Sequence, residues 1–199
     1  KESSAASDVY KRQLQKQSIA IKKRINLMNT AKNVTLIFFF SVCFSSFGQQ
    51  NPKTITNLIF QKTNLLRIEK GLEPFKKLDT LDYLAQYHSD NMVQNKFYEH
   101  IDHEGLSPVE RAEKLNIQAW RIKGNTFIGI AENIAQAPWF ENVRGCGDTR
   151  SNQAIAECLV QGWKKSPPHY KNILGDYVYL GVGISFDDKQ MGFATQNFR

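Results

Sequence analysis

The sequence predicts an α+β fold, with helices packed around a small antiparallel sheet that includes a C-terminal β-hairpin. Amphipathic helical patterns come first in the body of the chain, two alternating β patterns close it, and no regular strand–helix–strand repeat is present. A length of 199 residues suits one globular domain with a tail. With only 12 Gly and 6 Pro, the composition excludes collagen-like and low-complexity classes.

Two helices are predicted near the start of the body. Residues 55–70 carry apolar side chains at helical spacing and end at Gly71, a common helix stop. Asp79 is suited to cap a second helix, in which Leu81, Leu84 and Met92 share one stripe. His88 lies within that stripe, so we interpret it as a core or boundary histidine rather than a ligand.

Two further helices are marked by their end signals. Residues 107–110 (Ser-Pro-Val-Glu) form a capping box with proline at the first helical position, which predicts a short helix through Leu115. Residues 154–163 present another apolar face, and this helix has to stop before Pro167-Pro168.

The strand patterns lie in the second half of the chain. Residues 126–135 mix β-branched and aromatic side chains and predict a strand that ends near Glu132. Residues 180–186 alternate apolar side chains with Gly and Ser, and the polar turn 187–190 leads into a second alternating run, 191–198. Together these two runs predict the C-terminal β-hairpin.

The net charge of +7 sits at the N-terminal end. Residues 1–48 hold eight Lys/Arg and two Asp/Glu, whereas residues 49–199 hold eighteen and seventeen. A nearly neutral body argues against a nucleic-acid partner.

The first 48 residues are typical of a targeting segment. Basic residues precede Met28, and the short apolar run 34–44 is followed by small residues, so residues 28–48 predict a secretory signal peptide cleaved after Gly48. Residues 1–27 would be a polar extension, disordered or upstream of the true start. An uncleaved anchor and a lipoprotein signal ending at Cys43 are the alternatives, although the apolar run is short for a span. We expect a secreted protein, extracellular or periplasmic, that meets a membrane only through this segment.

Cysteine parity agrees with export. The mature chain keeps Cys146 and Cys158, an even pair that suggests a disulfide closing a short loop in an oxidising compartment. The alternative is a buried free Cys158 and an exposed free Cys146.

The chemistry-bearing residues are scattered. His100, His103 and His169 lie in turn-rich segments, where functional residues are common. No compact zinc signature and no glycine-rich phosphate loop is present, so no organic cofactor is expected.

Four segments read together are more specific. They are residues 97–111, Ala-Glu-Asn-Ile-Ala at 131–135, residues 162–174 (Gly-Trp-Lys-Lys-Ser-Pro-Pro-His-Tyr-Lys-Asn-Ile-Leu), and residues 180–184 leading to 194–198. In order and spacing they resemble the CAP superfamily of cysteine-rich secretory, antigen 5 and pathogenesis-related proteins. The domain is also called SCP, and the match is to its compact bacterial form. The resemblance covers about residues 54–199.

The resemblance implies an α-β-α sandwich with a central cleft lined by two histidines and two acidic residues. Carried across, these are His100, Glu132 and His169, while the second acidic position holds Ser166. Ala131 and Tyr170 also depart from the pattern, which usually has Gly and Arg there.

Two imidazoles and one carboxylate can hold Zn²⁺ or another divalent cation with an open position. The alternative is that His100, Glu132 and His169 only hydrogen-bond one another and hold three loops together. We place His103 and Ser166 in the cleft as well. Outside that set, we interpret Asn133 as a backbone hydrogen-bonding residue, Trp163 as core and Arg111 as half of a surface salt bridge.

We favour a non-enzymatic binding module, and the resemblance implies a lipid or sterol, a peptide or a cell-envelope component as its ligand. The alternative is a hydrolase in which His100 or His169 is the general base, Glu132 orients it, and metal-bound water or Ser166 is the nucleophile. A Cys146/His169 thiol enzyme is a third possibility, which a disulfide would argue against.

Overall fold

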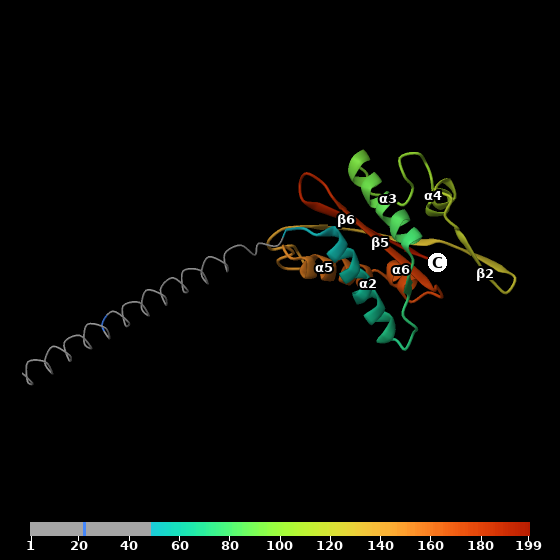
Figure 1. Ribbon diagram of the computed structural model, residues 1–199, viewed down its shortest axis with the longest axis horizontal. Coiled ribbons are helices and arrows are strands. Elements are labelled where there is room, and N and C mark those ends of the chain that lie inside the picture. The colour runs from blue at the N-terminus through green and yellow to red at the C-terminus, as the bar shows by residue number, and fades with distance from the viewer. Residues whose placement is uncertain (1–21, 23–48) are drawn as a thin grey trace, which may run out of the picture. The chain divides into compact units, whose positions relative to one another are not determined.

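The computed structural model describes Lys22 and residues 49–199. The expected signal peptide and polar extension lie outside these described residues. Residues 49–199 form three layers (Figure 1). Their elements, in order, are α2 (Pro52–Ile68), β1 (Lys76–Lys77), α3 (Asp79–Asn95), α4 (Pro108–Lys114), β2 (Trp120–Lys123), β3 (Thr126–Gly129), β4 (Ala131–Pro138), α5 (Asn152–Lys165), α6 (Pro167–Ile173), β5 (Tyr179–Phe186) and β6 (Met191–Phe198).

The central layer is a four-stranded sheet in the order β1-β5-β6-β4. Strands β5 and β6 form the predicted C-terminal hairpin, with Leu180 opposite Phe198. Strand β4 pairs antiparallel with β6 and lies at the sheet edge, whereas the two-residue β1 pairs parallel with β5. The predicted α-β-α sandwich is therefore confirmed, with one short parallel strand added to an otherwise antiparallel sheet.

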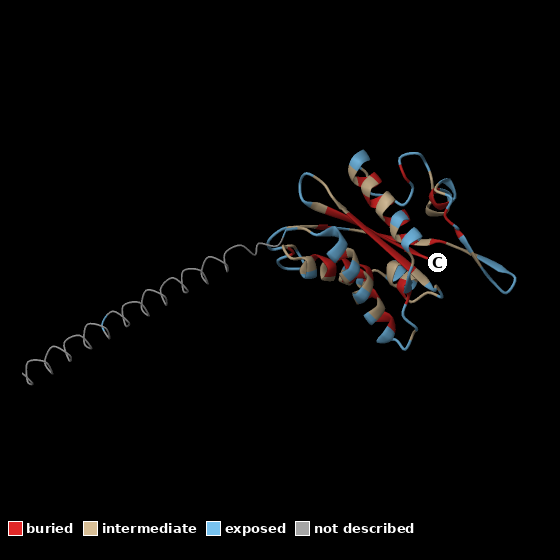
Figure 2. Ribbon diagram, viewed as in Figure 1, coloured by how far each residue is buried: buried red, intermediate tan, exposed pale blue. Residues whose placement is uncertain are grey.

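Side-chain alternation along β5 assigns the two faces of the sheet. Leu180, Val182 and Ile184 point into the main core, together with residues of α2 and α5. The opposite face of β5 presents Gly181 and Gly183 to α3. A Cβ on Gly181 would lie 2.1 Å from the Leu81 carbonyl carbon, so α3 packs directly on the strand backbone. In Figure 2 the buried hairpin runs between the helical layers.

Two predicted boundaries are corrected. The segment 126–135 is two strands in different sheets: β3 ends at Gly129 and pairs with β2, while β4 continues to Pro138 because β6 pairs with it along its whole length. Helix α3 has Leu78 as its N-cap, without a side-chain cap, and Asp79 is its first helical residue.

Helix α2 begins at Pro52, with Asn51 as its N-cap, and ends at Ile68, whereas residues 55–70 were expected. The remaining helix ends follow their sequence signals. Ser107 and Glu110 form the predicted capping box of α4. Helix α5 ends at Lys165, before the proline pair, as expected. The sequence reasoning missed α6, which begins at Pro167 itself, because proline at the first helical position starts a helix as well as it stops one.

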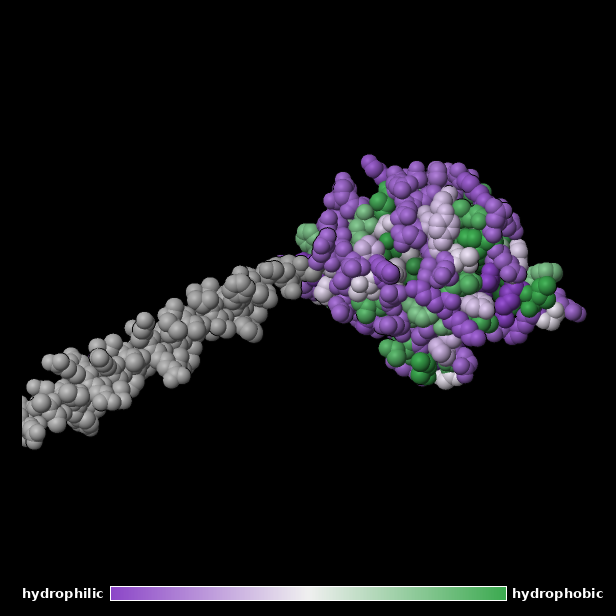
Figure 3. All heavy atoms as spheres, viewed as in Figure 1, coloured by the Kyte–Doolittle hydropathy of each residue, from purple (hydrophilic) through white to green (hydrophobic). Residues whose placement is uncertain are grey.

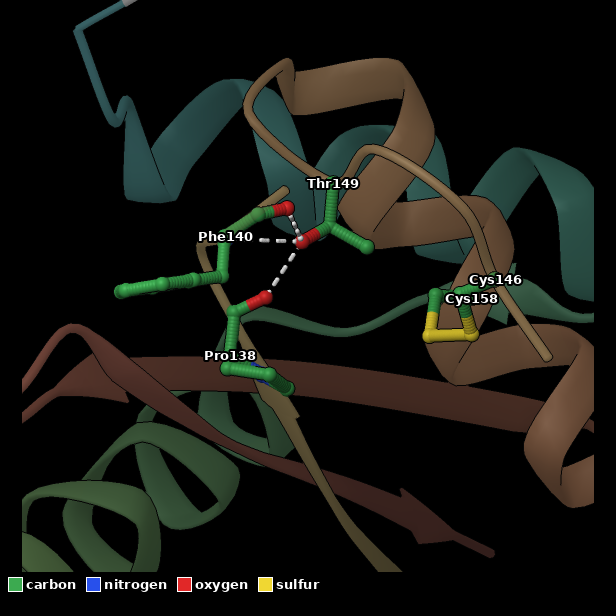
Figure 4. Close-up of a disulfide and its surroundings, with 5 residues drawn as sticks. All are labelled: Pro138, Phe140, Cys146, Thr149 and Cys158. Atoms are coloured by element: carbon green, nitrogen blue, oxygen red, sulfur yellow. Dashed lines mark hydrogen bonds between the residues drawn. A yellow bond between two sulfur atoms is a disulfide. The ribbon is translucent and has the colours of Figure 1, made fainter. Parts of the chain in front are cut away.

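The loop between β4 and α5 is closed by the disulfide Cys146–Cys158, which confirms the predicted pair (Figure 4). Thr149 holds the base of this loop: its Oγ1 accepts from the Phe140 amide at 3.0 Å and donates to the Pro138 carbonyl. Because Cys158 lies on α5, the disulfide ties the loop to the helical layer.

Candidate functional site

The candidate site lies beside the edge strand β4, where both helical layers reach the sheet. Glu132 is the second residue of β4 and faces the α3 layer. His100 comes from the loop between α3 and α4, and His169 from α6 on the other layer. The structure therefore brings all three predicted cleft residues to one end of β4, although they lie far apart in the sequence.

Glu132 is the buried centre of this group, with a side chain that is 1% exposed. Its Oε2 accepts from the Arg111 guanidinium, and its Oε1 lies 3.0 Å from His100 Nδ1. The amide of Asn197 on β6, oriented so that both its ends are satisfied, also donates to Oε2 at 3.1 Å. Glu132 therefore accepts hydrogen bonds from α4, from β6 and from the loop between α3 and α4.

Arg111 is the residue that sequence reasoning misjudged. It is fully buried on α4, so the expected surface salt bridge is instead a buried ion pair with Glu132. Its Nη1 also donates to the carbonyls of His100 and Leu106, at 2.7 and 2.9 Å. One guanidinium thus fixes both the carboxylate and the loop that carries His100. A buried arginine needs such a partner set, because an unpaired buried charge is strongly unfavourable.

His88 lies beneath the site, fully buried as the helical stripe predicted. Its Nε2 is 3.0 Å from the Glu99 carbonyl oxygen and 3.6 Å from Glu132 Oε1. Burial lowers the pKa of His88, with the Glu132 carboxylate acting in the opposite direction. The ring is therefore neutral at pH 7 and supports the loop from below.

The two cleft histidines differ in their surroundings. The His100 side chain is 46% exposed and is oriented by Glu132 through Nδ1, which leaves Nε2 free of that contact. Within the described residues, the His169 ring makes no hydrogen bond, and only its backbone carbonyl is held, by Asn133 Nδ2 at 3.0 Å. Burial, and secondly the nearby His100, lower the pKa of His169. The two rings are thus close enough to sense each other's charge.

The other predicted cleft residues lie at the margins. His103 Nδ1 is 2.8 Å from Asn91 Oδ1 on α3, in a contact separate from Glu132. Ser166 joins α5 to α6, and in the part of the chain that the structure describes its hydroxyl bonds to no histidine. Trp163 is core, as expected, and its indole donates to the Ile134 carbonyl at 3.0 Å.

The donor set fits a metal ion poorly. The Glu132 carboxylate is buried, and both of its oxygens accept hydrogen bonds from N–H groups. Only the two imidazoles are then left as available metal ligands. Among the described residues, no group of three or more His, Cys, Asp or Glu is placed to hold an ion. Glu132 instead matches the outer carboxylate that orients a histidine. A site on His100, Glu132 and His169 for Zn²⁺ or another divalent cation stays a prediction.

The geometry defines a class: a three-layer α-β-α domain whose sheet edge carries two histidines above a buried glutamate. The model of the Cysteine-rich secretory protein family (CAP) matches residues 60–198, and this chain belongs to that family.

Similar proteins agree with this assignment. The uncharacterized membrane protein YlbC of Bacillus subtilis (strain 168) is 28% identical over 141 residues, which is 70% of this chain and 33% of that protein. This chain therefore spans about a third of that relative.

Two solved structures share the fold. An extracellular SCP-domain protein from Bacillus anthracis str. Ames is 25% identical with a TM-score of 0.55, over 74% of this chain and 40% of that one. An outer surface protein from Borrelia burgdorferi is 17% identical with a TM-score of 0.57, over 75% of this chain and 94% of that one. Of the helices described here, none is both long and apolar enough to cross a membrane.

Proposed function

We propose that this chain is an exported, non-enzymatic CAP domain that binds a ligand or partner in the cleft beside His100 and His169. The ligand class is a lipid or sterol, a peptide or a cell-envelope component. Export is supported by the N-terminal signal pattern, the disulfide, and the extracellular and outer-surface proteins of similar fold.

The observation that carries a binding role is the state of Glu132. A general base or a direct metal ligand needs a lone pair that can reach substrate, whereas this carboxylate is buried and held by Arg111 and His100. Glu132 therefore acts as a positioning residue that fixes the His100 ring. A preorganised, rigid cleft of this kind favours recognition.

The Glu132–His100 contact fits a histidine base as well as a binding site, but no contact in the described residues supplies the hydrolase with a nucleophile. A serine mechanism needs the Ser166 hydroxyl within hydrogen-bond reach of a base, and within residues 49–199 it is paired with no histidine. Cys146 is in a disulfide, so a Cys146/His169 thiol mechanism lacks its nucleophile.

The test is a titration of the folded, ¹⁵N-labelled protein with four separate probes: short peptides, phosphatidylglycerol vesicles, peptidoglycan fragments and Zn²⁺. We expect one probe to shift amide resonances of residues 97–106 and 166–172. The shifts should be lost in His100→Ala and His169→Ala and kept in His103→Ala, the matched control.

Two results would overturn the proposal. One is that no probe perturbs the cleft. The other is turnover of an ester or peptide substrate that disappears in Ser166→Ala, which would establish the hydrolase instead. Zn²⁺ binding that needs both histidines would identify an ion as part of the ligand site.

A further inference from the structure

A cavity lies on the face of the sheet toward which Glu132 also points. It measures about 560 Å³, a size suited to a small ligand. Residues of the α3 C-terminus, the following loop, β4, β6 and the β5–β6 turn line it. Gln136 of β4 lies in its wall, four positions beyond Glu132 on the same side of the strand. At about 3.3 Å per residue, Gln136 lies roughly 13 Å along the strand from Glu132.

The floor of this cavity is apolar and aromatic. Met92 of α3 and Phe193 of β6 are buried and pack with Phe97 in one hydrophobic cluster. Tyr98 closes one side, with its ring centroid 6.4 Å from that of Phe193 in an edge-on arrangement. Such a floor favours an aliphatic or aromatic group of the ligand.

The rim of the cavity carries charges of both signs. Asp187 and Asp188 stand on the β5–β6 turn, while Lys96 follows α3 and Lys189 lies in the same turn. Asp187 is rigid, because its Oδ1 accepts from the amides of Lys189 and Met191, at 2.9 and 2.8 Å. No ion pair joins these four charged side chains to any other residue that the structure describes.

We propose that this cavity binds the amino-terminal end of a peptide whose first residue is apolar. The apolar side chain lies on Phe193 and Phe97, the terminal ammonium faces Asp187 and Asp188, and the lysines donate to peptide carbonyl oxygens. This inference rests on the proposed function and deepens it, because it names the class of ligand, a peptide that extends along β4 toward His100.

Charge complementarity selects this occupant among apolar ligands. A fatty acid could pair its carboxylate with a lysine but would leave both aspartates without a partner, and a sterol would leave all four rim charges without one. A peptide amino terminus supplies an ammonium, carbonyl acceptors and an apolar side chain within one residue. Charge-assisted hydrogen bonds of this kind are stronger than hydrogen bonds between neutral groups.

The experiment measures binding of Leu-Ala-Ala-Ala amide and Phe-Ala-Ala-Ala amide to the folded protein, read from the Met92 methyl resonance. N-acetylated versions of both peptides and decanoate are the comparison probes. The double variant Asp187→Asn/Asp188→Asn removes both charges, while the amide oxygen of the first substituted side chain can still accept from the turn. Glu69→Gln/Glu73→Gln, outside the cavity, is the charge-matched control.

We expect the free peptides to bind, and acetylation or the double asparagine variant to weaken binding about tenfold or more. The control variant should leave the Met92 response unchanged. Equal binding of acetylated peptides, a response to decanoate alone, or no response to any probe would overturn the proposal. Peptide binding lost in His100→Ala and kept in the asparagine variant would place the ligand in the cleft and reject this cavity.

Discussion

The Arg111–Glu132 ion pair is the contact on which the cleft depends. Both side chains are buried, and Arg111 also holds the backbone of the loop that carries His100. Taking away one partner leaves the other as an uncompensated charge in the interior. The pair therefore affects the position of His100 as well as the stability of the fold.

We predict that Glu132→Gln lowers the free energy of unfolding by about 3–5 kcal/mol, because Arg111 then stays buried without its counter-charge. Urea denaturation followed by circular dichroism measures this. Lys123→Gln is the control: its pair with Asp176 is exposed, so the change should be within about 1 kcal/mol. A Glu132→Gln protein as stable as the control would contradict the structural role of the pair.

Histidine burial predicts a loss of stability in acid. Burial lowers the pKa of His88 in the folded state, so the unfolded chain binds the proton more readily. The stabilising contribution is complete above pH 6.5, the ordinary pKa of histidine, and is lost as the pH falls through the folded-state pKa. The free energy of unfolding should fall by up to about 1.4 kcal/mol per pH unit for this one proton.

Denaturation curves between pH 8 and 5 check this dependence. His88→Gln keeps a donor for the Glu99 carbonyl and removes the titration, so its curve should be flatter than that of the wild type. Parallel curves for His88→Gln and the wild type would show that another group carries the acid sensitivity.

Among the elements, the contact of α3 with β5 sets the thickness of one layer. Both glycines on that face of β5 allow the helix backbone to touch the strand. A Cβ on Gly183 would lie 2.3–2.5 Å from the backbone of Ala85 and Gln86, so neither side can move aside through a rotamer change.

We predict that Gly183→Ala destabilises the protein by at least about 1–3 kcal/mol, the range for overpacking, because the whole helix has to shift. Thermal unfolding measures the loss. Gly162→Ala is the matched control: nothing lies within 4 Å of its Cβ on α5, so it should stabilise by roughly 0.5–1 kcal/mol. A tolerated Gly183→Ala would mean that α3 can slide on the sheet.

Helices and strands that depend on contacts between residues close in the sequence could be predicted from the sequence. The capping box of α4 and the alternation of the C-terminal hairpin involve residues within a few positions of each other. The extent of β4 was not predictable in the same way, because its pairing with β6 spans about 60 residues and extends the strand past its own weak pattern.

The same distinction applies to the site. His100, Glu132 and His169 could be named from four sequence segments, and the structure places them together. The burial of Arg111 could not be predicted, since α4 shows only that Arg111 lies near a helix end, and its partner Glu132 is 21 positions away on a strand. Tertiary packing, which decides burial, is absent from local patterns.

At the scale of the whole molecule, the apolar surface is uneven. The separate β2–β3 hairpin stands away from the main sheet, with Ile122 and Phe127 paired across it and each 68% exposed. Figure 3 shows hydrophobic side chains at that end of the domain. Arg121 and Lys123 occupy the opposite face and pair with Asp176. These ion pairs tie the exposed part of the hairpin to the body of the domain.

The Cys146–Cys158 bond has a consequence for transport. A chain that threads through a secretion channel has to lose its fold first, and export is the proposed fate of this protein. Without the disulfide, the domain lacks a stabilisation on the order of 3 kcal/mol. The reduced chain is therefore easier to unfold than the oxidised one. If the protein is exported as proposed, formation of this bond after transport would stabilise the fold and oppose the unfolding that a return passage requires.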